Sequence, residues 1–167
     1  VEVVSLLHGH WQWQPNQQHT NIDMPDVSST QQQAQKIIAP HDWGREPTFL
    51  NCRAWQNFHP PLPHEKILVL GSGEFSWIPF LIAEKLEQQG AEVYYSSTTR
   101  SPIKQGHAVE SICSFKDNYG LNINNYAYNV KHQQFDRVLL VIETAQDSVD
   151  PLLFEQIKNL EIISYES

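Results

Sequence analysis

The stretch KILVLGSGEF, residues 66–75, decides the fold class. Its first five residues form a short, almost wholly apolar run, which is typical of a strand covered on both faces. A glycine-containing turn follows, and between Ser76 and Gly90 apolar residues recur at helical spacing. The segment AEVYYSS, residues 91–97, predicts a second strand. A strand, a helix and a strand in this order indicate a parallel crossover unit.

The rest of the chain extends this pattern. FDRVLLVIE, residues 135–143, is the strongest candidate for a buried strand, and it is followed by a predicted helix over 151–160 and a predicted strand over 161–166. Residues 107–115 are expected to form a further strand or a strand-like arm, whereas the Asn- and Tyr-rich segment 116–129 is expected to be a loop. The sequence therefore predicts an α/β domain with a Rossmann-like, mostly parallel sheet flanked by helices.

Residues 1–63 differ in composition from this core, which spans residues 64–167. They are expected to form an irregular N-terminal extension with an initial strand over 1–7, a short helix over 31–38 and an arm over 40–63 that is rich in proline and tryptophan. We predict a single domain over residues 1–167. Because the chain opens with VEVVSLL and has no initiator methionine, we expect it to be the C-terminal fragment of a longer protein.

Composition excludes several classes of partner. The formal net charge of −8 argues against binding to nucleic acid or to an anionic membrane, since both need clustered Lys and Arg. No apolar run reaches the roughly 18 residues of a membrane span. Cys52 and Cys113 show no partner spacing, which favours reduced thiols and a cytoplasmic protein. His8 and His10 would share one face of a strand, but no third ligand stands at a fixed spacing, so we predict no metal site.

Three loops are expected at the carboxyl ends of the strands, where open parallel sheets bind ligands: 71–75, 98–102 and 143–148. Arg100 is suited to bidentate bonds with a phosphate or carboxylate. The hydroxyls of Thr98, Thr99 and Ser101 flank it, and the backbone amides of Gly71, Ser72 and Gly73 lie at a predicted helix start, which favours anions. The alternative is that Arg100 pairs with Glu74 or Glu143 and only braces the loops.

No cofactor is assigned from these loops. The third glycine of a dinucleotide fingerprint is replaced by Ser76, and the second strand ends in Thr99-Arg100 where an NAD-binding domain needs an acid. The missing acid argues equally against a methyltransferase, although an arginine there is compatible with NADP. Tyr126, Tyr128 and Asn129 are candidates to stack on a ring and to bond to it, or else to pack on the sheet. The polar cluster at residues 41–45 is a candidate lid.

Four motifs in order also suggest a family: GSGEF, a proline-bearing helix, Thr99-Arg100-Ser101-Pro102 and YAYN at residues 126–129. In this the chain resembles the TRSP domain. The resemblance implies a domain that lies C-terminal to a phosphoribosyltransferase-like domain, in bacterial proteins from gene neighbourhoods linked to tellurite resistance and stress. It further implies an accessory domain that binds, or helps to convert, a phosphorylated sugar or nucleotide-like compound.

Two hypotheses follow. In the first, Arg100 and the 71–73 amides hold the anion of a ribose-phosphate-like ligand, Tyr128 and Asn129 contact it, and Glu74 and Glu143 bind sugar hydroxyls or act as general acid and base. Whether such a domain is itself an enzyme, as part of a phosphoribosyltransferase polypeptide, is left open. In the second hypothesis the domain is a non-catalytic interaction module that docks a transferase domain or a partner chain through Trp11, Trp13, Trp43 and Trp55.

Overall fold

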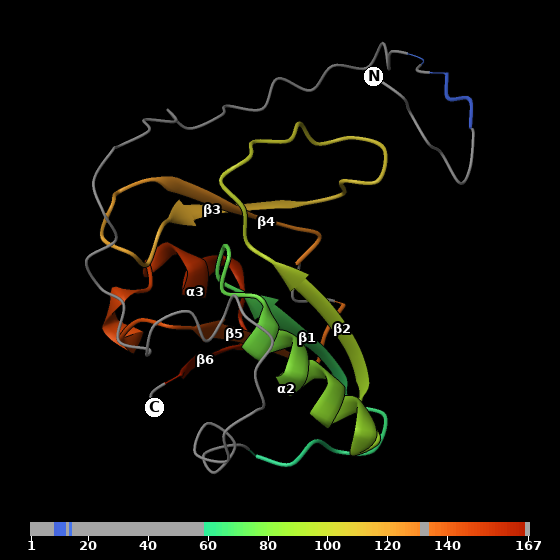
Figure 1. Ribbon diagram of the computed structural model, residues 1–167, viewed down its shortest axis with the longest axis vertical. Helices are drawn as coiled ribbons and strands as arrows, with labels where there is room; N and C mark the ends of the chain where they lie inside the picture. Colours follow the sequence, from blue (N-terminus) through green and yellow to red (C-terminus); the bar gives the residue numbers. More distant parts are fainter. Residues whose placement is uncertain (1–8, 13, 15–58, 131–133, 166–167) are drawn as a thin grey trace, which may run out of the picture.

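The computed structural model describes residues 9–12, 14, 59–130 and 134–165. Its centre is a four-stranded parallel sheet in the order β2-β1-β5-β6 (Figure 1). The strands span Lys66–Gly71 (β1), Glu92–Ser97 (β2), Arg137–Ile142 (β5) and Leu160–Ser164 (β6). The strand over residues 1–7, the helix over 31–38 and most of the arm over 40–63 lie outside the described residues.

Helix α2 (Trp77–Gln88) covers one face of this sheet. Ile78, Ile82 and Leu86 of the helix pack on Ile67 and Val69 of β1, as the helical spacing of the apolar residues predicted. Residues Leu68 and Leu70 alternate with these in the strand and face the opposite side, where they join a second core cluster. Burial on both faces explains why the first strand is an unbroken apolar run.

The second face is covered differently from the prediction. An antiparallel hairpin of β3 (Ile112–Lys116) and β4 (Asn124–Tyr128) lies over it, together with the short helix α3 (Leu152–Gln156) (Figure 1). Cys113, Phe115 and Ala127 of the hairpin enter the apolar core on this side. The prediction that residues 116–129 form a loop was wrong for β4, because backbone pairing with β3 orders a segment that lacks an apolar pattern.

The α/β class and the mostly parallel sheet are thus confirmed, whereas the flanking helix layers are only partly present. The hairpin stands where a doubly wound fold would carry a crossover helix between β2 and β5. The predicted helix over residues 151–160 shrinks to five residues in α3, since the backbone at Ile157 is already extended. The structure therefore does not establish the Rossmann-like architecture in full.

The topology nevertheless places a ligand-binding position. From β1 the chain passes through α2 to β2 on one side, and from β5 it passes through the turn η1 (Gln146–Ser148) and α3 to β6 on the other. The carboxyl ends of β1 and β5 are therefore a topological switch point, where open α/β sheets leave a crevice for ligands.

Candidate functional site

The switch point is filled by a chain of buried hydrogen bonds. Ser72 Oγ donates to Asn118 Oδ1 over 2.6 Å, and Asn118 Nδ2 donates to Thr144 Oγ1 over 2.8 Å. Thr144 Oγ1 lies 2.8 Å from Ser148 Oγ, which donates to the carbonyl of Ala145 over 2.6 Å. These bonds run in one consistent direction from β1 to the loop after β5. Polar groups at this depth need such partners because water does not reach them.

Tyr119 adds a second bridge across the same point. Its hydroxyl lies 3.0 Å from the carbonyl oxygen of Ser72 and 3.0 Å from Oε1 of Glu143. Glu143 is only 2 % exposed, so its carboxylate is part of the framework rather than of the surface. We call the group of Ser72, Asn118, Tyr119, Glu143 and Thr144 the switch-point junction.

Asp117 holds the segment that supplies Asn118 and Tyr119. Its Oδ2 accepts hydrogen bonds from the backbone N–H groups of Tyr119 and Leu121, both at 3.1 Å, and its Oδ1 accepts one from Ile123 at 2.9 Å. Residues 117–119 were missed as part of the site because they lie in the segment predicted to be a loop. The local signal was available, since Asp and Asn before a glycine commonly bond to their own backbone in turns.

Thr98 connects the second predicted loop to the first. Its Oγ1 accepts the N–H of Gly73 over 2.9 Å, and its own N–H donates to the carbonyl of Gly71 over 2.9 Å. The N–H that we expected to face an anion is therefore used inside the fold. Gly73 has φ 59°, and a Cβ on Gly71 would lie 2.6 Å from the carbonyl oxygen of Phe75. Both glycines are thus required by the turn itself.

Hydrogen bonds fix almost the whole backbone of the turn at Thr99–Pro102. Thr99 exchanges two backbone hydrogen bonds with Tyr126, at 3.0 and 2.8 Å, and its Oγ1 accepts the N–H of Ser101 at 3.1 Å. The hydroxyl of Tyr128 donates to the carbonyl of Ser101 and accepts the N–H of Ile103, each over 2.7 Å. Pro102 has no N–H to satisfy. The tyrosine thereby fixes the path of the turn.

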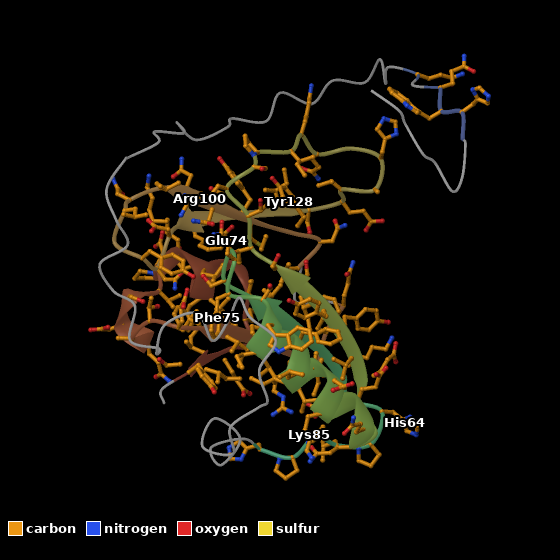
Figure 2. All side chains as sticks on the ribbon, viewed as in Figure 1. His64, Glu74, Phe75, Lys85, Arg100 and Tyr128 are labelled. Carbon is orange, nitrogen blue, oxygen red and sulfur yellow. The ribbon has the colours of Figure 1, made fainter. Side chains whose placement is uncertain are left out.

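Arg100 is the exception in this turn. It is exposed, and among the residues that the structure describes none forms a hydrogen bond or a salt bridge with its guanidinium. Figure 2 shows Arg100 and Glu74 at the same end of the molecule, above the carboxyl end of β1, while Lys85 and His64 lie at the other end. The alternative in which Arg100 braces the loops by pairing with Glu74 or Glu143 is therefore not seen within the described ranges.

Comparison with known protein families identifies the family of the chain. The family model described as "TRSP domain C terminus to PRTase_2" matches residues 51–157, which is more than half of the chain. The chain belongs to the TRSP domain family. That description associates the TRSP domain with a phosphoribosyltransferase-type domain on its N-terminal side. No curated protein and no solved structure gives a significant match. Bacterial origin and the link to tellurite resistance stay predictions.

Within this TRSP domain the Thr-Arg-Ser-Pro motif is the turn just described, and we call Thr99–Pro102 the TRSP turn. The motif residues have different roles: Thr99 and Ser101 close the turn through local hydrogen bonds, whereas Arg100 carries a charge that no described residue pairs. The three hydroxyls that were predicted to surround a ligand thus have different surroundings. That of Thr98 accepts the N–H of Gly73, that of Thr99 accepts the N–H of Ser101 within the turn, and Ser101 is exposed.

The two other predicted ligand contacts also have structural partners. Asn129 adopts φ 59°, and its side chain accepts from Glu110 N at 2.8 Å and donates to the carbonyl of Ala108 at 2.8 Å. Tyr128 stacks on Tyr126, with ring centroids 6.2 Å apart. The Tyr126 hydroxyl is buried without a hydrogen-bond partner within the described part of the TRSP domain, and this burial raises its pKa.

The structure describes only some of the residues on which the remaining predictions depend. Within the described residues no three His, Cys, Asp or Glu side chains gather as a metal site, and no helix is long and apolar enough to cross a bilayer. Cys113 is a buried cysteine of the apolar core on the hairpin side. Trp11 is 87 % exposed. Several predicted features lie outside the described residues. They are the candidate metal ligand His8, the candidate lid at residues 41–45, Cys52, and the tryptophans Trp13, Trp43 and Trp55.

Proposed function

We propose that this TRSP domain binds a phosphorylated ribose or nucleotide-like compound at the carboxyl edge of its sheet, as an accessory domain of a phosphoribosyltransferase-type protein. One observation carries the proposal. Arg100 is an exposed cation with no described partner, on a turn whose other polar groups are nearly all bonded. A rigid turn that presents a guanidinium without a partner among the described residues suits bidentate binding of a phosphate, because little backbone order remains to be imposed on binding.

We further assign different tasks to the two predicted catalytic acids. Glu74 is exposed at the same edge, and we propose that it contacts the sugar hydroxyls or acts as the general acid or base of a reaction there. Glu143 is buried in the switch-point junction, so we assign it a positioning role through Tyr119. Thr98 and the 71–73 turn then act as the support that fixes the edge beside Arg100.

The test is calorimetry and thermal shift on the 167-residue chain with phosphate, ribose 5-phosphate and phosphoribosyl diphosphate. We expect saturable binding that Arg100→Ala lowers at least tenfold and that Arg100→Lys restores only in part, since an ammonium group cannot form the bidentate fork. Lys85→Ala is the matched control, because it removes one exposed positive charge at the other end of the sheet. If none of the three ligands binds at millimolar concentration, the proposal is wrong.

A second candidate function is supported by an exposed group of aromatic residues on α2 and β2. Trp77 stacks on Phe80 at 5.6 Å, and Phe80 meets Tyr95 edge-on at 5.7 Å. Phe80 and Tyr95 are each 40 % exposed, and such residues are common in interface cores. We propose the PRTase_2 domain named in the family description as the partner of this surface. Phe80→Ser should then weaken binding to that domain, supplied as a separate protein, whereas Phe154→Ser on α3 should not.

A further inference from the structure

A groove of about 950 Å³ lies on the hairpin side of the sheet, next to the TRSP turn. Its floor includes Leu68, Tyr94 and Ser96. Tyr94 is in register with Leu68, and Ser96 with Leu70, in adjacent parallel strands. Because both leucines belong to the core cluster on the hairpin side, Tyr94 and Ser96 face that side as well.

The groove exists because the hairpin covers only part of this face of the sheet. Strands β3 and β4 have five residues each, and their apolar side chains pack in the cluster that holds Val138 and Leu140 of β5. Neither Tyr94 nor Ser96 of β2 is in that cluster, and every residue of β2 except Val93 is exposed. In a doubly wound sheet a crossover helix would bury this surface. Among the described residues no element packs over this face of β2.

Aromatic rings form much of the groove. Tyr94 is 44 % exposed, and its ring meets Phe135 at 5.4 Å with an interplanar angle of 66°. Tyr128 lines the end of the groove that lies nearest the TRSP turn. Rings held in this way by the fold provide flat apolar surfaces, on which a further planar ring can stack.

Most polar groups of the groove already have partners in the fold. Lys66 lies 3.7 Å from Glu92, and the side-chain amide of Asn159 donates to the carbonyls of Phe135 and Asp136. Two lining groups differ: the hydroxyl of Ser96 and the carboxamide of Gln134 are exposed and have no partner within the described ranges. A hydroxyl and an amide can each both donate and accept a hydrogen bond, as the edge of a heteroaromatic ring requires.

We propose that this groove binds the base of a nucleotide, so that the ligand of the Arg100 site is a nucleoside phosphate and not a bare sugar phosphate. Tyr128 links the two sites, because its ring lines the groove while its hydroxyl holds the carbonyl of Ser101, the neighbour of Arg100. The base stacks on Tyr94 and bonds to Gln134 and Ser96, and the phosphate meets Arg100. A groove with aromatic walls and few unpaired polar groups is the usual composition of such a site. This inference rests on the proposed function for its phosphate end only.

The experiment compares AMP, ribose 5-phosphate and adenosine by calorimetry on the 167-residue chain, with GMP, CMP and UMP as further bases. We expect at least one nucleotide to bind fivefold or more tightly than ribose 5-phosphate, a conservative value for one stacked base. Tyr94→Ala should bring that nucleotide to the affinity of ribose 5-phosphate, and Tyr94→Phe, which keeps the ring, should not. Gln134→Ala should lower the affinity for the preferred base and change the ranking of the four bases.

The controls separate this inference from the proposed function. Phe154→Ala removes a 47 % exposed ring from α3 and should change nothing, and circular dichroism checks that Tyr94→Ala is folded. If ribose 5-phosphate binds through Arg100 but no nucleotide binds more tightly, the base site is overturned and the phosphate site stands. If no phosphate compound binds but adenosine binds through Tyr94, the base site stands alone. If neither nucleotides nor adenosine bind, the base site is wrong.

Discussion

The switch-point junction and the TRSP turn are neighbours, since Gly73, which follows Ser72, donates a hydrogen bond to Thr98, which precedes Thr99. They nevertheless use their polar groups in opposite ways. In the junction, hydroxyls, an amide and a carboxylate are buried and bonded to one another. In the turn the backbone is fixed in the same manner, but the Arg100 side chain is exposed and no described residue pairs with its guanidinium. Polar residues at the end of a parallel strand are therefore not equal candidates for ligand binding. Polar side chains whose hydrogen bonds complete the fold must be distinguished from polar side chains that the fold leaves without a partner.

The largest effect that separates the two regions is expected at Asp117. Asp117→Ala leaves three buried backbone N–H groups without their acceptor, and we expect the free energy of unfolding to fall by about 3 kcal/mol. Urea denaturation monitored by tryptophan fluorescence measures the loss. Asp117→Asn keeps part of the acceptor geometry and should lose less. A loss below about 1 kcal/mol for the alanine variant would mean that the junction is less dependent on this segment than its hydrogen bonds indicate.

Two buried tyrosines provide a matched pair with a smaller effect. Tyr119→Phe removes a hydroxyl that bridges Ser72 and Glu143, and should cost about 1–2 kcal/mol. Tyr126→Phe removes a hydroxyl that is fully buried and has no hydrogen-bond partner within the described residues, so its cost should be near zero, or the variant should be slightly more stable. Equal losses in the two variants would contradict the distinction between a bridging hydroxyl and an unpaired one.

The raised pKa of Tyr126 predicts how the stability of the domain changes at alkaline pH. Burial, and to a lesser extent the neighbouring Tyr128, raises the pKa of Tyr126 above its ordinary value of 10.0. The folded state therefore holds this proton more tightly than the unfolded state does. Its contribution to stability is complete below pH 10 and is lost as the pH rises through the folded pKa. Denaturation at pH 8 and pH 10.5 should show a smaller alkaline loss for Tyr126→Phe than for wild type, and an identical loss would exclude the effect.

Much of the fold was predictable because two of its parallel strands, β1 and β5, are buried on both faces. The apolar runs at 66–70 and 135–143, and the helical spacing between them, depend on local pattern alone. The hairpin was not predictable in this way, since β4 contains Asn124, Asn125 and two tyrosines and is ordered by pairing with β3. The backbone pairing that orders β4 leaves no apolar periodicity in the sequence of this strand.

The candidate site shows the same limit. Three loops could be placed at one edge of the sheet from topology, and Arg100 could be singled out by its chemistry. Which hydrogen bonds those loops make could not be foreseen, because the partners Asn118 and Tyr119 come from the unpredicted connection between β3 and β4. The groove was missed for a related reason. The groove forms because the hairpin does not extend over β2, and nothing in the sequence of β2 indicates that this strand is left uncovered.

Only a small effect on stability is expected at Arg100 itself, and it tests the comparison most directly. Since its side chain is exposed and has no partner within the described part of the chain, Arg100→Ala should change the free energy of unfolding by less than about 0.5 kcal/mol. Tyr128→Phe, which releases the carbonyl of Ser101 and the N–H of Ile103, should cost more, about 1 kcal/mol. If Arg100→Ala were instead the more damaging of the two, the guanidinium would be a brace like the groups of the junction. A small loss of stability together with a large loss of phosphate affinity would mark it as the residue that the fold holds ready for a ligand.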